Sequence, residues 1–283
     1  MSTTQTIQEL PLELIGMLAT MLDGEDFLAM RGTCRELRDG SAFEFCQRYL
    51  DLVEISGTRD SVHHLLNILT SPSLPQAQQT VRKLVVSAPR LRPSEAFEEP
   101  KTTDVAHLLR AMPNLTTAKL AEDTNLAESL REAQSASIFL ASMAQLPSRV
   151  CRLDLFAVQL HGDPLANMLE AHRKDLYILS FNVVTLDSLS AWQRVLRTMR
   201  SSGIRRLEMA WLKYVNHKDG SGDISILKGA VKLLKLKQKR GGRGFVSEDY
   251  GEATRGCVKQ ALEIILQRLG SHVVLENGAE ANA

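Results

Sequence analysis

The chain has 283 residues, of which 44% are hydrophobic and 24% charged, and its net charge is +1. This composition is ordinary for a soluble globular protein, and the length allows one large domain or two smaller ones. A near-zero charge gives no overall attraction to nucleic acid or to a membrane surface. The apolar runs also stop short of the ~18–20 residues that a membrane helix needs. We therefore expect no membrane partner and no nucleic acid.

The first 40 residues are predicted to form a compact unit of short helices. Leu14, Leu18 and Leu22 recur every four residues, as the apolar stripe of an amphipathic helix does. Pro11 fits the first helical position, and Gly24 is placed to end this helix. A unit of about 40 residues stabilises itself poorly by burial alone. We expect it to share apolar surface with a neighbour, in the same chain or in another protein.

The same stretch carries a spaced set of residues from position 10 to position 37. It consists of Leu10-Pro11-x-Glu13-Leu14-Ile15, Leu18, Leu22, Asp26-Phe27-Leu28, Arg31, Cys34-Arg35 and Leu37. In order and spacing this set resembles the F-box family. Thr20-Met21 and Thr33 depart from the residues that the family often has at these places, but neither departure removes a large apolar anchor.

In the F-box family this segment docks on a Skp-type adaptor, which connects it to a cullin-RING ubiquitin ligase. The resemblance implies that the adaptor is contacted by Leu10, Pro11, Leu14, Ile15, Leu18, Leu22 and Leu28. Some of these residues must also form the core of the helical unit. The alternative is an ordinary N-terminal helical cap on a larger domain.

Beyond residue 49 an apolar triplet with the spacing 1, 4, 6 recurs, and each copy predicts a short strand. The copies begin 26 to 35 residues apart, at Leu50/Val53/Ile55, Val81/Leu84/Val86, Leu115/Ala118/Leu120, Val150/Leu153/Leu155, Leu176/Leu179/Phe181 and Ile204/Leu207/Met209.

Amphipathic helices are predicted between these strands. Their apolar positions are Val62/Leu65/Leu66/Leu69, Val105/Leu108/Leu109/Met112, Phe139/Met143/Leu146, Leu165/Met168/Leu169 and Leu189/Trp192/Leu196. Asp60, Asp104, Asp163 and Asp187 stand where helix N-caps are expected. An alternation of helix and strand with a period near 28 residues favours a repeat solenoid.

The triplet resembles the LxxLxL core of leucine-rich repeats, which F-box proteins often carry. The expected fold class is α/β: a short all-α F-box at 1–48, then a degenerate leucine-rich-repeat-like βα solenoid (horseshoe) at 49–215. Residues 216–283 would supply a basic loop, a terminal capping helix and a flexible tail. The family's Asn beyond each triplet is replaced, by Thr58, Pro89, Asp123, Val158, Val184 and Leu212, so the turns must be satisfied differently. A flavodoxin-like or other parallel α/β layer fold is the main alternative, although no phosphate-binding glycine loop follows the first strand.

Residues between the triplet members are expected to line the opposite face of the sheet. The residues predicted to bind substrate there are Arg152, Asp154, Phe156, Asn182, Arg206, Glu208 and, just beyond, Trp211. Arginine and aromatic residues dominate interface hot spots. The alternative for Phe156 and Trp211 is a place in the core under a loop.

The segment from Ile224 to Ser247 holds seven basic residues and no acidic one. It fits either a helix or a seventh strand through Val231, Leu234 and Leu236. A nuclear import signal, a patch for acidic substrates, a nucleic-acid contact and a solvated helix face all remain open. A last amphipathic helix from Ala253 to Leu269 is expected to cap the solenoid.

The sequence predicts no enzyme, no cofactor and no metal site. It has no GxSxG, HExxH, P-loop or kinase signature. His63 and His64 diverge on consecutive helix positions, and no base is placed to activate Cys151 through His161. The four cysteines are scattered and residues 1–6 do not resemble a signal peptide, so we expect a reducing compartment, the cytoplasm or the nucleus.

These features predict the substrate-recognition subunit of a Skp-cullin-F-box ubiquitin ligase. The N-terminus would bind the adaptor and, through it, a cullin, while the repeats would bind a protein substrate whose identity is unknown. Two alternatives are a scaffold that never joins a ligase and a small-molecule receptor. A receptor would need a deep apolar pocket closed by the loop at 123–125 or by the loop at 213–223.

Overall fold

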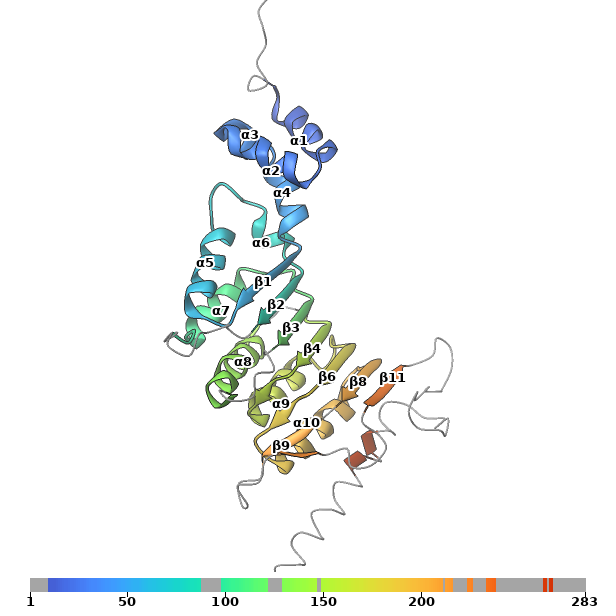
Figure 1. Ribbon diagram of the computed structural model, residues 1–283. Coiled ribbons are helices and arrows are strands. Elements are labelled where there is room, and N and C mark those ends of the chain that lie inside the picture. The colour runs from blue at the N-terminus through green and yellow to red at the C-terminus, as the bar shows by residue number, and fades with distance from the viewer. Residues whose placement is uncertain are drawn as a thin grey trace, which may run out of the picture.

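The computed structural model consists of a small helical part followed by an α/β part (Figure 1). The residues that the structure describes are 10–87, 98–121, 129–146, 149–210, 212–215, 223–225, 233–237, 262–263 and 265–266. Ten helices are found within these ranges, together with a mostly parallel sheet.

Four short helices form the N-terminal part, which we call the helical module. They are α1 (Leu12–Met21), α2 (Gly24–Thr33), α3 (Arg35–Gly40) and α4 (Ala42–Tyr49). The prediction that Gly24 ends the first helix was wrong. Leu22 is the C-cap of α1, and the Asp23 carboxylate accepts the Asp26 N–H at 3.0 Å and so caps α2, which starts at once.

The core of the helical module is small, and Arg48 of α4 ties it together. Ile15, Ala19, Phe27 and Leu37 are buried in it. The Arg48 guanidinium donates hydrogen bonds to the backbone oxygens of Leu22 at 2.8 Å and Ala19 at 2.9 Å. It also lies 4.8 Å from the centre of the Phe27 ring. Arg48 thereby satisfies carbonyl groups that the end of α1 leaves without a helical partner.

The α/β part alternates strands and helices. Its helices are α5 (Arg59–Leu69), α6 (Ala77–Thr80), α7 (Thr102–Arg110), α8 (Ser129–Met143), α9 (Gly162–Ala171) and α10 (Leu189–Ser201). The main strands are β1 (Leu52–Ser56), β2 (Lys83–Ser87), β3 (Thr117–Ala121), β4 (Arg152–Phe156), β6 (Ile178–Asn182), β8 (Arg206–Ala210) and β11 (Leu233–Lys237). The six strands predicted from the triplets and the helices predicted between them are confirmed.

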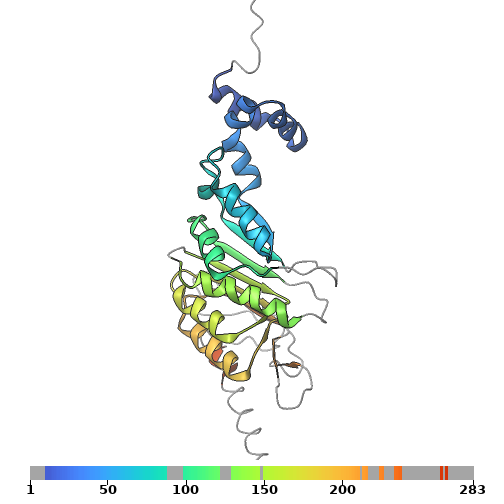
Figure 2. The same ribbon diagram turned by 90° about the vertical axis from the view of Figure 1, so that its left-hand side faces the viewer.

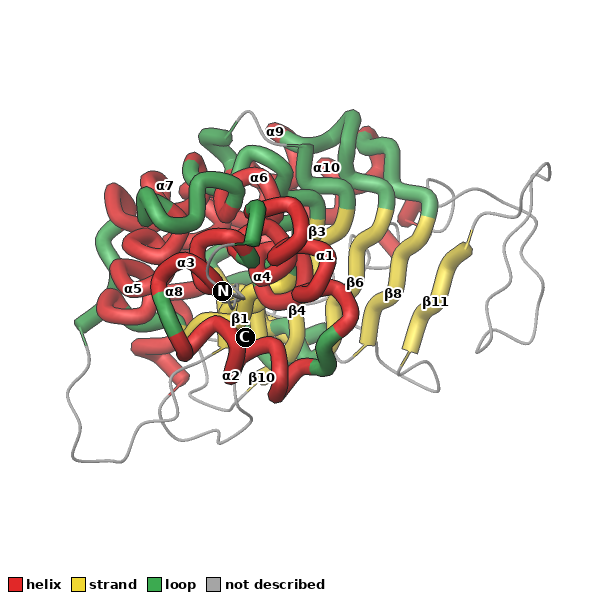
Figure 3. The backbone as a smooth tube through the Cα atoms, turned by 90° about the horizontal axis from the view of Figure 1, so that it is seen from above, coloured by secondary structure: helices red, strands yellow, loops and turns green. Residues whose placement is uncertain are grey.

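The main sheet has the order β1-β2-β3-β4-β6-β8-β11, which is the order of the chain. All neighbours are parallel except β11, which runs antiparallel to β8. Figure 3 shows β6, β8 and β11 side by side in that order. A doubly wound sheet reverses its strand order at a switch point, and the described strands show no such reversal. The flavodoxin-like alternative therefore does not fit.

The helices of the α/β part lie on one face of this sheet. Neighbouring helices from α5 through α7, α8 and α9 to α10 pack against one another. In Figure 2 they stand in front of the strands in chain order, from cyan α5 to orange α10. Triplet side chains such as Leu153, Leu179 and Leu207 fill the space between helices and sheet. The opposite face of the sheet carries no helix among the described residues.

A second, smaller sheet shows how the turns are satisfied without asparagines. Its order is β10-β9-β7-β5, with β5 (Gln159–Leu160), β7 (Thr185–Leu186), β9 (Lys213–Val215) and β10 (Asp223–Ser225). Ala157 and Val183 turn the chain between the two sheets with left-handed φ angles of 54° and 57°. The Ala157 N–H donates to the Asn182 oxygen at 2.7 Å and the Thr185 N–H to the Val158 oxygen at 2.9 Å. Backbone pairing between repeats thus replaces side-chain amides, and Val158 and Val184 are free to enter the core.

The predicted N-caps were wrong. Thr58 caps α5 and Ser188 caps α10 through their hydroxyl groups, while His161 and Lys101 precede α9 and α7. Acidic residues link neighbouring helices instead, by contacts between segments far apart in the chain. Asp104 Oδ2 lies 3.1 Å from His63 Nε2 and 3.4 Å from Arg59 Nε. Asp187 Oδ1 accepts the Gly162 N–H at 3.3 Å.

The C-terminal segment is described only in pieces. Of the two alternatives for the basic segment, the strand is present at 233–237, as β11. Of the predicted helix from Ala253 to Leu269, helical residues are described at 262–263 and 265–266, and Leu262 joins the core. The rest of that helix and the tail lie outside the described residues. Nowhere in the described ranges does a helix have the length and hydropathy to cross a membrane.

Candidate docking surfaces

Large apolar side chains are exposed mainly on the helical module. Met21 is 76% exposed and Leu12 is 61% exposed. Leu12, Leu14, Met17, Leu18, Met21, Leu28 and Phe43 make up what we call the apolar surface, and Tyr49 at the end of α4 is also 36% exposed. The larger α/β part adds only Leu52, Phe156 and Tyr177 among its described residues. A concentration of this kind marks a partner site in a soluble protein.

The apolar surface arises because α1 has more apolar positions than the module can bury. Ile15 and Ala19, four residues apart, point into the core. Leu14 and Leu18 form a second stripe beside them and stay 44% and 36% exposed. A helix that is apolar on several faces needs cover on several faces, and the module covers one.

Most of the residues predicted to contact an adaptor are accessible. Pro11, Leu14, Leu18 and Leu28 are exposed, and Leu10 and Leu22 are partly buried. Ile15 is 1% exposed and belongs to the core of the module. Its part in any docking is to hold α1 in place. Gly40 of α3 packs directly on it, since a Cβ atom at Gly40 would lie 2.9 Å from Ile15 Cγ2.

Four residues of the apolar surface were not predicted from the sequence. They are Leu12, Met17, Met21 and Phe43. The sequence does show that α1 carries apolar residues on all sides. Three short neighbouring helices cannot bury all of them. Phe43 could not be found in this way, because its exposure depends on how α4 meets α3.

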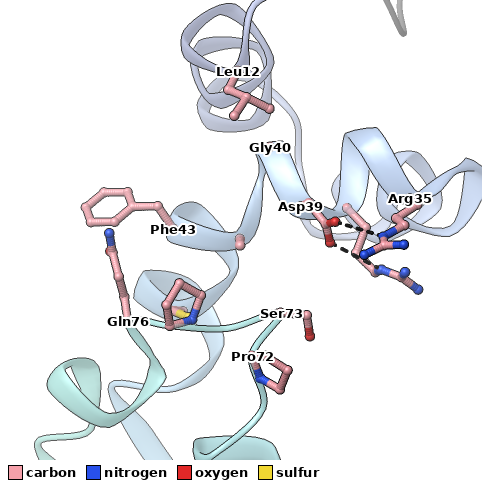
Figure 4. A pocket seen from close by; sticks show the side chains of 12 residues that line it. Leu12, Arg35, Asp39, Gly40, Phe43, Pro72, Ser73 and Gln76 are labelled. Carbon is pink, nitrogen blue, oxygen red and sulfur yellow. Dashed lines mark hydrogen bonds and ion pairs between the residues drawn. The ribbon is translucent and has the colours of Figure 1, made fainter.

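A hollow of about 730 Å³ lies between the helical module and the loop that joins α5 to α6 (Figure 4). Leu12 and Phe43 bound it on the side of the module, and Pro72 and Gln76 bound it on the side of the loop. The ion pairs of Asp39 with Arg35 at 3.3 Å and with Arg38 at 3.8 Å lie at its rim. The hollow therefore extends the apolar surface toward the α/β part.

Cys46 also lines this hollow, in surroundings that favour its protonated thiol. Burial raises the pKa of its thiol, and the charge of Arg31 opposes this only in part. A raised pKa keeps the thiol protonated, and the thiolate is the reactive form.

The exposed face of the sheet carries six of the seven residues predicted to bind substrate. The strand register places Arg152, Ile178 and Arg206 in one row across β4, β6 and β8. The next row holds Asp154, Ser180 and Glu208, and Phe156 and Asn182 stand in the third. Trp211 lies outside the described residues.

Each arginine on this face is paired with a carboxylate on its own strand. Arg152 Nε lies 2.7 Å from Asp154 Oδ2, and Arg206 Nη2 lies 2.5 Å from Glu208 Oε1. Phe156 is 41% exposed, which excludes the buried alternative for it. From β4 to β8 the face therefore carries paired charges with an exposed aromatic ring at one end, and such a surface suits binding to a protein.

The structure does not bring Cys151 and His161 together as a reactive pair. Cys151 and His161 lie beyond opposite ends of β4, and His161 contacts Asp187 at 3.3 Å. In the described ranges no three histidine, cysteine, aspartate or glutamate side chains gather as metal ligands would.

No protein-family model matches this chain. A comparison with curated proteins also found no match. The features of the molecule that point to a function are the two surfaces and the residue pattern of the helical module.

Proposed function

We propose that the chain is the substrate-recognition subunit of a Skp-cullin-F-box ubiquitin ligase. The observation that carries this proposal is the apolar surface, because it lies on the segment whose residues resemble an F-box. Exposed apolar area costs about 25 cal/mol for each Å² that could be buried. A partner that covers Leu14, Leu18 and Met21 together would recover this energy, and a Skp-type adaptor is the partner that the resemblance implies.

The α/β part would hold the substrate. Strands in chain order with helices on one face support a degenerate leucine-rich-repeat-like solenoid, a horseshoe, with its bare sheet face open to a ligand. On that face Arg152, Phe156 and Arg206 are the proposed contacts. The mechanism would be positional, because a tethered substrate reaches a high effective concentration beside the ligase. The chain itself would perform no bond chemistry, and it would work in the cytoplasm or the nucleus.

The proposal is tested by a pull-down of the full chain with a purified Skp-type adaptor, followed by addition of a cullin. The variant Leu14→Glu with Leu18→Glu should lose the adaptor, since both side chains are exposed and their change leaves the core intact. Tyr177→Glu, an equally exposed site on the α/β part, is the matched control and should bind normally. Binding by the double variant would contradict the assigned surface.

The same experiment separates the alternatives. Adaptor binding without cullin would support the scaffold, and no adaptor binding would reduce the helical module to a cap on the α/β part. The loops at 123–125 and 216–222, expected to close a receptor pocket, lie outside the described residues. The described hollow is elsewhere, against the helical module.

A further inference from the structure

The first strand of the sheet, β1, has a strand on one side only among the described residues. The Lys83 N–H donates to the Asp51 oxygen at 2.9 Å, and the Gly57 N–H donates to the Ser87 oxygen at 2.8 Å. Backbone groups alternate between the two sides of a parallel strand. Val53 and Ile55 therefore pair with β2, and the N–H and C=O groups of Leu52, Glu54 and Ser56 point away from the sheet.

A groove of about 580 Å³ lies along this open edge. Its strand side is Val53 to Ser56, and its helix side is one face of α5, formed by Asp60, Ser61, His64, Leu65 and Ile68. An open edge strand beside a helix is the setting in which proteins bind an extended peptide as an added strand. Five residues of β1 span about 17 Å, which is enough for a segment of five or six residues.

The lining of the groove is acidic, and it is partly apolar on the side of α5. It holds two carboxylates, Glu54 and Asp60, and no lysine or arginine. Glu54 lies midway along β1 and accepts a hydrogen bond from the Ser87 hydroxyl at 2.8 Å. Ile68, which is partly buried, supplies apolar contact, while Leu65 is only 3% exposed and belongs to the core beneath the groove. Because α5 runs back along β1, Asp60 lies near the carboxyl end of the strand and Ile68 lies toward its amino end.

We propose that this groove binds an extended segment of a partner protein as a strand beside β1. The segment carries lysine or arginine side chains for Glu54 and Asp60, and apolar side chains for Ile68. Main-chain hydrogen bonds to Leu52, Glu54 and Ser56 hold it, and the alternation of its side chains gives specificity. The site is separate from the apolar surface and does not depend on adaptor binding.

The test uses the full chain and a defined probe, an acetylated and amidated hexapeptide that alternates lysine and valine. Binding is followed by amide chemical shifts in an NMR titration. We expect shifts in β1 and the face of α5, and none with a hexapeptide that alternates glutamate and valine.

Two lysine–valine peptides, N-methylated on odd or on even residues, then test the strand pairing. One of them should bind about tenfold weaker or worse, since its methyl groups remove bonds to β1, and the other should bind as the parent does.

A pair of variants tests the same edge from the side of the protein. Glu54→Pro removes an N–H that points away from the sheet and leaves the pairing with β2 intact. An edge strand tolerates proline at such a position. It should lose more affinity than Glu54→Ala, which loses the carboxylate alone. Equal affinity of these two variants, equal binding of the two methylated peptides, or no shift with any peptide would overturn the proposal. A dimer joined through β1 in solution would also overturn the proposal, because a second copy of the chain would then occupy the groove. Binding that appears only after residues 1–9 are removed would overturn it as well, because it would assign the groove to those residues.

Discussion

Arg48 shows how much of the helical module depends on one side chain. It is 24% exposed, pairs with Glu44 at 2.5 Å and reaches the end of α1 across the Phe27 ring. Arg48→Met keeps most of the side-chain volume and removes the donors. Because hydrogen bonds from charged groups contribute about 1.5–3 kcal/mol, we expect a loss of that order in the stability of the module. Hydrogen exchange of the α1 amides measures it, with Arg35→Met as the control, because Arg35 is 80% exposed and its ion pair is with Asp39 of its own helix.

Val183 is the residue with the clearest backbone strain. A β-branched residue with φ near 57° is unusual. Val183→Gly should raise the free energy of unfolding by about 1 kcal/mol, since glycine adopts this conformation without the steric cost. Urea denaturation checks this. Val184→Gly, one residue along and fully buried, should destabilise the protein instead, and a loss of stability in both variants would mean that Val183 is not strained.

At the scale of elements, α9 and α10 approach each other so closely at Gly162 that a larger residue would not fit there. A Cβ atom at Gly162 would lie 2.3 Å from Ala191 Cβ and 3.1 Å from its Cα. Gly162→Ala must therefore push the two helices apart, and overpacking of this kind costs about 1–3 kcal/mol. Thermal unfolding measures the effect. Gly32→Ala is the control, because nothing lies within 4 Å of that Cβ position.

The contact between α5 and α7 should make stability depend on pH. Burial of Asp104 acts to raise its pKa, but the hydrogen bond from His63 and the charges of His63 and Arg59 outweigh this and lower the pKa. A lowered pKa in the folded state means that the ionised carboxylate stabilises the fold. This stabilisation is complete above the unfolded pKa of about 3.9 and is lost as the pH falls through the folded pKa. In urea unfolding of the wild type and of Asp104→Asn between pH 7 and pH 3, the difference in stability should shrink at the acidic end, and a constant gap would contradict the linkage.

For the whole molecule, the positions of the strands could be predicted and the pairing of charges could not. The triplets located β1, β2, β3, β4, β6 and β8, because a strand buried on one side needs apolar residues at fixed intervals. The short strands β5 and β7 were not predicted. The helix starts were missed because Asp104 and Asp187 serve contacts with segments 25 or more residues away. In the helical module the leucine stripe at 14, 18 and 22 was evident. Its orientation was not, since Ile15 and Ala19 compete with it for the core and only packing decides between them.

The antiparallel direction of β11 limits where the sheet can gain further βα units. A parallel strand can be followed by a helix and another strand of the same kind, so that further units could be appended after β8. A strand that returns in the opposite direction occupies the place where the next unit would start. Duplication of a βα unit at this end would have to displace β11, whereas a unit duplicated between β1 and β8 would only lengthen the row. We expect relatives that differ in size to differ in the middle of the sheet and to share its last strand.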